Sequence, residues 1–340
     1  MEATRAQIVE RRPRPLPGKA VSALVFRLLL PRLGLIRALA WGLKLYQRLG
    51  IQWAMREFRL LKLLGPLDSL EQQLPHLPRF FKAPSSGVIP AAGTATRRVG
   101  MLSGCVMPLV YGPVNEATAR VLAENGCDVV IPKAQGCCGA LNTHSGERES
   151  ARELARKNID VFLAADVEAV VVNSAGCSAS MKEYNELLKD DPLYAAKAER
   201  LSALVKDVNE YLASLPLKPP RGEIRARVTY QDSCHLARAQ RIREAPREVL
   251  RAIPGLTLVE MEGSDICCGA AGIYNITHRD MSRQILDHKM EHATAAEPQI
   301  IATANPGCML QLEVGVRRAG MKARVAHVVE LLDEAYRGGT

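Results

Sequence analysis

The sequence is poor in aromatic residues, which make up 4% of its 340 residues. Proteins that bind single-stranded nucleic acids stack bases on aromatic side chains, so we expect no nucleic-acid partner. The sequence also lacks a G-x-G-x-x-G run, a P-loop, an H-E-x-x-H run and a Ser-His-Asp arrangement. It therefore predicts neither a bound nucleotide nor a hydrolytic site, and no residue qualifies as catalytic.

Long apolar runs are also missing. Between Ala20 and Met55 no stretch of 18 residues is free of charge, so a transmembrane helix is not expected. The first residues include two glutamates, and the apolar run over residues 20–30 is interrupted by Arg27, unlike a secretory signal. We therefore expect a cytoplasmic protein.

Acidic residues are scarce in the first hundred positions, which hold 5 Asp and Glu against 17 Lys and Arg. The rest of the chain holds 31 against 28, together with all nine cysteines, of which Cys105 is the first. This division predicts a cationic N-terminal region, residues 1–96, joined to a nearly neutral body that carries the cysteines.

The N-terminal region is expected to contain an extended arm, basic helices and a linker. Prolines mark the arm, Pro31 separates a helix that starts near Val21 from one over residues 33–64, and residues 75–96 form a linker with little structure. Most cations of the longer helix fall on one stripe. The stripe suits an anionic membrane surface or a partner, but also a helix that covers the body and keeps its cations in water. We favour the second interpretation, because Trp41 lies among the cations and because Gly34, Gly42 and Gly50 weaken the helix.

Nine cysteines are the most informative feature that the sequence does contain. An odd number in a chain of this length, with two adjacent Cys-Cys pairs, does not suit a secreted disulfide scaffold. Reduced cysteines that surround a metal ion or a cluster are the better interpretation.

Eight of the nine cysteines obey an internal repeat. The first copy contains RVGMLSGC at residues 98–105, QGCCGA at 135–140 and VVVNSAGC at 170–177, and the second contains RVTYQDSC at 227–234, DICCGA at 265–270 and IIATANPGC at 300–308. A tail repeats as well, as VKDVNEYL at 205–212 and VAHVVELL at 325–332. The sequence thus predicts two tandem pseudo-repeated domains, residues 97–221 and 222–340.

Each copy alternates short β-rich runs with amphipathic helical ones. Strands are expected at 99–102, 128–131 and 169–172 and at 228–231, 257–260 and 300–303, with helices at 115–124, 147–164 and 178–188 and at 245–252, 280–293 and 309–319. This alternation predicts an α/β fold with mostly parallel sheets. Because the cysteines follow strands, three separate segments of each copy can meet at one edge of its sheet.

The four cysteines of each copy are therefore expected to form one group. The groups are Cys105, Cys137, Cys138 and Cys177 in the first copy and Cys234, Cys267, Cys268 and Cys308 in the second. Four thiolates are the ligand set of a [4Fe–4S] cluster or of a structural zinc ion. We favour the cluster, because a zinc site more often has two C-x-x-C segments and the sequence has none. Redox dithiols or buried thiols are the third alternative.

The pattern Cys-x31-Cys-Cys-Gly-x37-Cys, with x32 and x38 in the second copy, resembles the tandem cysteine-rich "CCG" domains of heterodisulfide reductase subunits, lactate-utilisation proteins and the glycolate oxidase iron–sulfur subunit. Further segments resemble the last of these: GCCGALNTH at 136–144, KEY at 182–184, CCGAAGIY at 267–274, TH at 277–278, KM at 289–290 and TANPGC at 303–308. The resemblance covers about residues 16–336, including the basic helices.

The resemblance implies an iron–sulfur subunit of an oxidoreductase complex of the glycolate dehydrogenase type. FAD on partner subunits would oxidise glycolate or another 2-hydroxy acid, and this chain would pass the electrons on, with quinone as the expected acceptor. The basic helix would bring the complex to the inner face of the cytoplasmic membrane. A lactate-utilisation or heterodisulfide-reductase-like subunit and a zinc-stabilised scaffold are the alternatives.

The sequence departs from the family pattern in two respects. Fuller members of the wider family end each motif in C-x-x-C, whereas the last positions here are Ser180 and Gln311, so we expect a four-cysteine cluster and no fifth thiolate. The usual ferredoxin-like module with C-x-x-C-x-x-C-x-x-x-C-P runs is also missing. We expect it on a separate polypeptide or upstream of a late gene start.

Other residues near the cysteines are weaker candidates. His144, His235 and His278 would each tune a bound cluster or move protons, but a polar loop residue with local partners is the favoured interpretation. Cys127 lies outside the repeat and is expected to be a small buried apolar residue. Residues 182–184 are expected on a solvated helix face.

Overall fold

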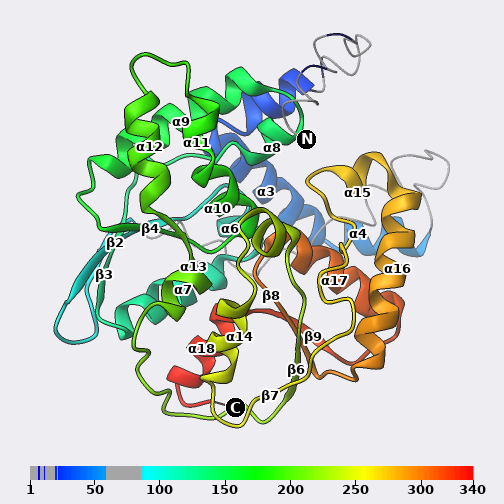
Figure 1. Ribbon diagram of the computed structural model, residues 1–340. Coiled ribbons are helices and arrows are strands. Elements are labelled where there is room, and N and C mark those ends of the chain that lie inside the picture. Colours follow the sequence, from blue (N-terminus) through cyan, green and yellow to red (C-terminus); the bar gives the residue numbers. More distant parts are fainter. Residues whose placement is uncertain (1–6, 8–10, 12–19, 21, 59–85, 340) are drawn as a thin grey trace.

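A computed structural model of the chain describes residues 22–58 and 86–339, together with residues 7, 11 and 20. Its body contains two sheets, one from each copy of the repeat, with helices packed on their faces (Figure 1). The predicted α/β class with two tandem repeats is confirmed.

The two sheets have the same strand order where the repeat applies. The first sheet runs β1-β3-β2-β4-β5 and the second β7-β6-β8-β9. The strands are β1 Gly87–Ile89, β2 Arg97–Leu102, β3 Cys127–Ile131, β4 Ala169–Val172 and β5 Val205–Asp207 in the first sheet, and β6 Arg227–Tyr230, β7 Thr257–Leu258, β8 Ile300–Thr303 and β9 Arg324–His327 in the second. Only β1 pairs antiparallel to its neighbour, so both sheets are mostly parallel.

The central strands are apolar on both faces because helices cover both faces of each sheet. Every residue of β4 (AVVV) and of β8 (IIAT) is buried. In the first sheet Val99 pairs with Val129 on one side and with Ala169 on the other. Because parallel strands all end at the same edge, the segments that follow β2, β3 and β4 lie next to one another.

The expected helices are present, with boundaries that differ by a few residues. The first copy contains α6 Met107–Val110, α7 Gly112–Glu124, α8 Ala140–His144, α9 Arg148–Leu163, α10 Ala175–Lys182, α11 Tyr184–Leu187, α12 Ala195–Leu204 and α13 Val208–Ala213. The second contains the π-helix η3 His235–Ala239 and α14 Glu244–Arg251, α15 Tyr274–Thr277, α16 Arg279–Ala295, α17 Pro306–Arg318 and α18 Val328–Tyr336. The helix expected over 178–188 is divided between α10 and α11.

Helices from the two copies pack together in a pseudo-symmetric way. α7 packs on α18 and α13 packs on α14, and in the repeat α7 corresponds to α14 and α13 to α18. One hydrophobic cluster runs through this contact, from Val121 in α7 to Leu331 in α18. Arg120 also donates two 2.8 Å hydrogen bonds to the buried carboxylate of Asp333 across it. The two copies therefore share one core, and the boundary between residues 221 and 222 stays a prediction.

The repeated tail of each copy forms a short strand followed by a capped helix, which the sequence left unassigned. Asp207 caps α13 and His327 caps α18. Each side chain accepts a hydrogen bond from the backbone N–H two residues later, at 3.0 Å and 3.2 Å. A glutamate three residues later accepts from the N-cap's own N–H, which completes a capping box in both copies.

The N-terminal region contains the π-helix η1 Ala23–Leu29 and the helices α3 Leu33–Arg48 and α4 Ile51–Glu57. The helix expected over 33–64 is interrupted at Gly50, whose φ of 72° is left-handed. The rest of that expected helix, beyond residue 58, and the expected arm lie outside the described residues. The expected linker is described only from residue 86, and there it is partly wrong, because residues 87–89 form β1.

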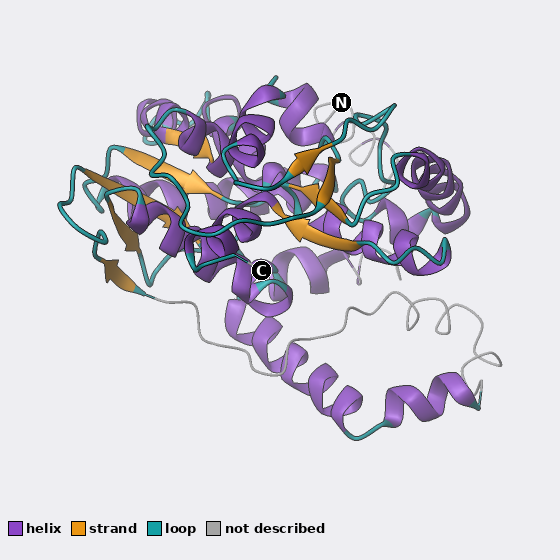
Figure 2. Cartoon of the chain, turned by 90° about the horizontal axis from the view of Figure 1, so that it is seen from below, coloured by secondary structure: helices purple, strands orange, loops and turns teal. Residues whose placement is uncertain are grey.

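The helices of this region relate to the body in different ways. η1 packs on the first copy, where Asn142 donates a 3.0 Å hydrogen bond to the carbonyl of the buried Phe26. α3 and α4 reach away from the two sheets (Figure 2), and the side chains of Leu39, Trp41 and Trp53 are 59%, 57% and 64% exposed. The favoured expectation that the longer basic helix covers the body is therefore wrong. No helix in the described part of the chain is both long enough and apolar enough for a bilayer-spanning segment.

Candidate functional site

Each copy brings its four cysteines to the carboxyl edge of its sheet. In the first copy Cys105 follows β2, Cys137 and Cys138 lie between β3 and α8, and Cys177 lies in the first turn of α10. In the second copy Cys234 follows β6, Cys267 and Cys268 lie between β7 and α15, and Cys308 lies in the first turn of α17. Three separate segments thus supply four thiols in each copy, in the grouping that the sequence predicts.

The thiols of the first copy contact one another and form no disulfide. Cys137 Sγ lies 3.4 Å from Cys105 Sγ. Hydrogen bonds from Cys105 and Cys138 hold the pKa of Cys137 well below its usual value. The hydrogen bond from Cys138 likewise lowers the pKa of Cys177, whereas donation and burial raise the pKa of Cys105 and Cys138. Two of the four thiols therefore have lowered pKa values, and the thiolate is the form that binds metals.

The second copy repeats this electrostatic pattern. A hydrogen bond from Cys234, followed by one from Cys268, lowers the pKa of Cys267 to about 2. Cys308 has a lowered pKa because Cys268 donates to it, while the pKa values of Cys234 and Cys268 are raised. Corresponding cysteines thus carry pKa shifts of the same sign in both copies.

A glycine makes the tight turn after each Cys-Cys pair. Gly139 and Gly269 have φ values of 81° and 86°, a left-handed backbone that favours glycine. Their N–H groups donate to Cys137 Sγ at 3.5 Å and to Cys267 Sγ at 3.3 Å. A Cβ at Gly269 would lie 2.6 Å from the carbonyl oxygen of Ser282, so a side chain does not fit there without displacing backbone.

The donor set of each site is four sulfur atoms, and no fifth thiol is available. At the positions where fuller members of the wider family have a further cysteine, Gln311 donates a 3.1 Å hydrogen bond to Ser282 Oγ, and Ser180 is half-buried. The thiols lie in direct contact, and within residues 22–58 and 86–339 no group of three or more His, Cys, Asp or Glu side chains is arranged to hold a metal ion. Four soft sulfur donors nevertheless fit, by their chemistry, an iron–sulfur cluster or zinc.

The two sites touch through corresponding residues of the repeat, Ser174 and Asn305. Ser174 Oγ lies 3.4 Å from Asn305 Oδ1, which also accepts a 3.2 Å hydrogen bond from the N–H of Gly176. Asn305 Nδ2 donates to Cys308 Sγ at 3.5 Å, and a hydrogen bond from Ser174 helps to lower the pKa of Cys177. The internal repeat predicts that these two residues correspond, but it does not predict their contact, which depends on how the copies pack.

The histidines near the cysteines have two different environments. His144 and His235 come from different copies, and their Nε2 atoms lie 3.2 Å apart. His235 Nδ1 lies 3.6 Å from Cys234 Sγ, so this pair joins the second site to helix α8 of the first copy. His278 is exposed, stacks on Tyr274 with ring centroids 4.5 Å apart and has a 2.9 Å contact with Thr277 Oγ1. His278 therefore fits the interpretation as a polar residue with local partners. His144 and His235 instead form a contact between the copies that the sequence did not predict.

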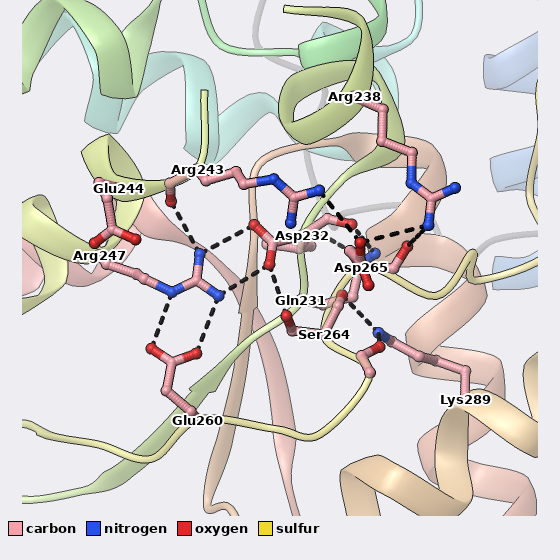
Figure 3. Close-up of polar contacts among 12 residues, drawn as sticks. Gln231, Asp232, Arg238, Arg243, Glu244, Arg247, Glu260, Ser264, Asp265 and Lys289 are labelled. Carbon is pink, nitrogen blue, oxygen red and sulfur yellow. Dashed lines mark hydrogen bonds and ion pairs between the residues drawn. The ribbon is translucent and has the colours of Figure 1, made fainter. Parts of the chain in front are cut away.

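Charged side chains form a network along the segments that lead to Cys234 and to the second Cys-Cys pair (Figure 3). Arg247 donates hydrogen bonds of 3.0 Å and 2.9 Å to the two carboxylate oxygens of Asp232, which is buried two residues before Cys234. The same guanidinium binds both oxygens of Glu260, at 2.9 Å and 3.0 Å. Lys289 is fully buried on α16, and burial lowers its pKa to about 8. Sequence reasoning named Lys289 only as part of the family resemblance, because nothing in the sequence distinguishes it from a solvated lysine.

Neutral side chains occupy the same surroundings in the first copy. Gln135 Oε1 accepts a 2.7 Å hydrogen bond from the N–H of Ser103. Asn158 accepts from the N–H of Gly136 and donates to the carbonyl of Cys137, both at 2.9 Å. The loop that carries Cys137 and Cys138 is therefore fixed by amides rather than by charges.

Two further expectations have different outcomes. Cys127 is fully buried in the hydrophobic core of β3, and burial raises its pKa, as expected of a structural cysteine. The expectation of a solvated face at residues 182–184 is wrong for Tyr184, which is fully buried and donates a 2.8 Å hydrogen bond to the carbonyl of Cys138. Its ring packs in the core beneath the first site, because α10 ends at Lys182 and α11 turns toward the sheet.

Known proteins resemble this chain over most of its length. The chain matches the family described as "Cysteine-rich domain" (CCG) over residues 99–182 and 228–313, and the family described as "Glycolate oxidase iron-sulfur subunit, linker region" over residues 17–74. It is 40% identical to the "Probable glycolate oxidase iron-sulfur subunit" of Bacillus subtilis (strain 168), over 98% of this chain and 77% of that protein. It is 37% identical to the "Glycolate oxidase iron-sulfur subunit" of Escherichia coli (strain K12), over 70% of this chain and 58% of that protein.

Two other similarities extend the comparison. "Lactate utilization protein A" of Geobacillus kaustophilus (strain HTA426) is 32% identical to the chain, over 69% of this chain and 98% of that protein. The crystal structure of a hypothetical protein from Helicobacter pylori has a TM-score of 0.54 at 10% identity, over 99% of this chain and 76% of that one. The last similarity concerns the fold alone.

Proposed function

Since the chain belongs to the family of glycolate oxidase iron–sulfur subunits, we propose that it is the electron-transferring subunit of a complex that oxidises glycolate or a related 2-hydroxy acid. The observation that carries the proposal is the gathering of four thiols at the carboxyl edge of each of two repeated parallel sheets. Two such sites that touch one another suit the passage of electrons better than they suit a single structural metal.

In this proposal each copy holds one [4Fe–4S] cluster. The ligands are Cys105, Cys137, Cys138 and Cys177 in the first copy and Cys234, Cys267, Cys268 and Cys308 in the second. A bound cluster of this type supplies reversible one-electron transfer. The chain's own residues set its surroundings: the N–H groups of Gly139 and Gly269 and the side chains of Ser174 and Asn305 donate to, or hydrogen-bond with, the cysteine sulfurs. Such hydrogen bonds favour the more negatively charged, reduced state.

The remaining chemistry belongs to partner subunits. Oxidation of a 2-hydroxy acid to a 2-oxo acid releases two electrons and two protons, which FAD on a partner would accept together. This chain would then carry the electrons one at a time toward an acceptor, for which quinone is proposed. A separate ferredoxin-like protein that exchanges electrons with these sites is a further proposed partner.

We also propose that α3 and α4 contact an anionic membrane surface. α3 carries Arg37, Lys44 and Arg48 and no acidic residue, and its Leu39 and Trp41 are exposed. Cations combined with exposed Leu and Trp side chains suit the interface of an anionic bilayer. The full chain should sediment with vesicles that contain anionic lipid but not with neutral vesicles, and Trp41→Glu should weaken that binding. Equal binding of the variant, or no binding at low salt, would refute this part of the proposal.

A subunit for lactate oxidation is the second candidate. It is favoured by the coverage of the lactate utilization protein, 98% of which aligns with this chain. Dye reduction by the assembled complex separates the candidates, because glycolate and lactate can be supplied one at a time. Faster turnover of lactate would favour the second candidate.

Metal and sulfide analysis of the anaerobically purified chain, together with EPR of its reduced form, tests the iron–sulfur proposal. We expect about eight iron atoms and eight sulfides per chain if both copies are filled. Cys137→Ser should lose about half of both, whereas Cys127→Ser, a change of equal size outside the sites, should lose neither. Stoichiometric zinc without iron, or equal behaviour of the two variants, would refute it.

A further inference from the structure

Lys289 and Asn158 occupy the same position in the two copies. α9 and α16 correspond residue by residue at an offset of 131, and five of the buried positions coincide. These pairs are Ala151 and Ser282, Ala155 and Leu286, Asn158 and Lys289, Ile159 and Met290, and Phe162 and Ala293. The one ionisable side chain in this set is Lys289, so the repeat places a cation in the second copy where the first has a neutral amide.

The ammonium of Lys289 is held by carbonyl oxygens. Its Nζ donates to the carbonyl of Gly263 at 3.0 Å and to that of Ser264 at 2.7 Å, on the loop that leads to the second Cys-Cys pair (Figure 3). Among the described residues Lys289 forms no ion pair. Its position depends on the loop, and the loop positions Cys267 and Cys268.

The carboxylates that face Lys289 are already engaged by arginines. Asp232 is bound by Arg247 at 2.9 Å, and Asp265 lies 3.4 Å and 3.2 Å from the guanidinium nitrogens of Arg238 and Arg243. Lys289 also lies within electrostatic range of Cys268 and Cys308, two proposed cluster ligands. The charge of the ammonium therefore acts mainly on the second site.

Asn158 gives the first site no such charge. It bonds to the N–H of Gly136, the carbonyl of Cys137 and the hydroxyl of Tyr184, all of which are neutral. The two sites thus have the same thiols and the same glycine turns. The second site differs from the first by the buried Asp232–Arg247 ion pair and by one further buried positive charge, that of Lys289.

We propose that Lys289 gives the second copy the higher reduction potential, so that electrons which enter the chain reside preferentially at the second site. Reduction adds one negative charge to a site that already holds four thiolates. A fixed cation nearby, shielded from water, stabilises the reduced state. This inference rests on the proposed iron–sulfur function and deepens it by giving electron flow a direction within the chain.

The test measures the midpoint potential of each site in the full chain by EPR-monitored redox titration. Cys137→Ser leaves the second site filled, and Cys267→Ser leaves the first, so the two signals can be assigned. We expect the second site to be more readily reduced. Lys289→Gln keeps a donor for the two carbonyls but removes the charge, and it should lower the reduction equilibrium constant of the second site about tenfold, or about 59 mV for one electron.

Arg283→Gln is the matched control, because it removes one positive charge from an exposed position on the same helix. It should leave both potentials unchanged, since water screens the exposed charge. A first site that is reduced as readily as the second, or a filled second site that Lys289→Gln does not shift, would overturn the inference. If Lys289→Gln does not retain its cluster, the order of the two potentials in the cysteine variants decides. A chain without iron would refute the proposed function itself, whereas filled sites of equal potential would refute only this inference.

Discussion

The two copies of the repeat share their strand order, their thiols and their left-handed glycines, but their buried polar surroundings differ. Around the first site Gln135 and Asn158 fix the loops through neutral amides. Around the second, Asp232, Arg247 and Lys289 do so with charges. The comparison indicates that the backbone and donor set can stay the same while the electrostatic environment of each site is set separately.

The neutral surroundings of the first site and the charged surroundings of the second should respond differently to the loss of a hydrogen-bond partner. A buried amide needs only hydrogen-bond partners, so the loss of one partner costs about 1–3 kcal/mol. A buried ion pair also depends on its counter-charge, and the loss of one partner leaves an uncompensated ion in a medium of low dielectric constant. The second copy should therefore be the more sensitive to single substitutions near its site.

The largest difference should appear at Arg247. Arg247→Met leaves the carboxylate of Asp232, which is 2% exposed, without its bidentate partner, and should lower the free energy of unfolding by about 3–5 kcal/mol. Thr118→Val, at the corresponding position of α7, removes the hydrogen bond that the hydroxyl accepts from Asn173 and the one that it donates to the carbonyl of Val114, and should cost about 1–2 kcal/mol. Urea unfolding of both variants checks this, and equal losses would contradict the comparison.

The capping residues provide a pH-dependent version of the same comparison. Burial lowers the pKa of His327 from 6.5 to about 4 and raises that of Asp207 from 3.8 to about 6. The contribution of His327 to the free energy of unfolding therefore decreases as pH falls from 6.5 to 4, because the unfolded chain binds the proton more readily. The contribution of Asp207 to the free energy of unfolding decreases as pH rises from 3.8 to 6, because this carboxyl group ionises more easily in the unfolded chain. Each effect amounts to about 3 kcal/mol, and between pH 4 and 6 they oppose each other.

Substitution by asparagine keeps each cap and removes its titration. His327→Asn should become more stable as pH falls from 6 to 4, because Asp207 is then the one of the two capping residues that still titrates. Asp207→Asn should become less stable over the same range. Unfolding midpoints measured at several pH values check the signs, and parallel pH profiles for the two variants would show that the shifts are misassigned.

The sequence predicted the features of the two copies that are repeated and local. Short apolar runs predicted β2, β4, β6 and β8, because such a pattern is carried by neighbouring residues. The internal repeat predicted which four thiols belong to each site. The strands β5 and β9 have three and four residues and mix charged with apolar side chains, so their pattern is too short to read.

Tertiary contacts explain what the sequence did not predict. Lys289 follows the spacing of an ordinary amphipathic helix, and its burial depends on a loop 25 residues away in sequence. The exposure of Leu39 and Trp41 likewise depends on where α3 lies relative to the sheets, which local periodicity does not determine. The contacts between the copies, such as that of His144 with His235, need the packing of α7 and α18.

The glycine turns should differ by a smaller amount. Gly139→Ala places a side chain on a left-handed backbone and should cost about 1–2 kcal/mol, since its Cβ would meet Ala151 O at an ordinary 3.4 Å. Gly269→Ala adds a 2.6 Å approach to the carbonyl of Ser282, so it should cost more. Urea unfolding gives both values, and a larger loss for Gly139→Ala would contradict the difference in space.

The smallest expected effect concerns the contact between Ser174 and Asn305, the corresponding residues through which the two sites touch. Asn305→Ala removes the acceptor for Gly176 and the donor to Cys308, and should cost about 1 kcal/mol. In a double-mutant cycle with Ser174→Ala we expect a coupling of about 0.5 kcal/mol, because their 3.4 Å contact is long. Ser214 lies away from both sites and its hydroxyl donates to the carbonyl of Tyr211, so Ser214→Ala should be additive with Asn305→Ala. If the effects of Ser174→Ala and Asn305→Ala on the free energy of unfolding simply add, the two sites are energetically independent of each other. The shared hydrophobic core would then be what couples the two copies.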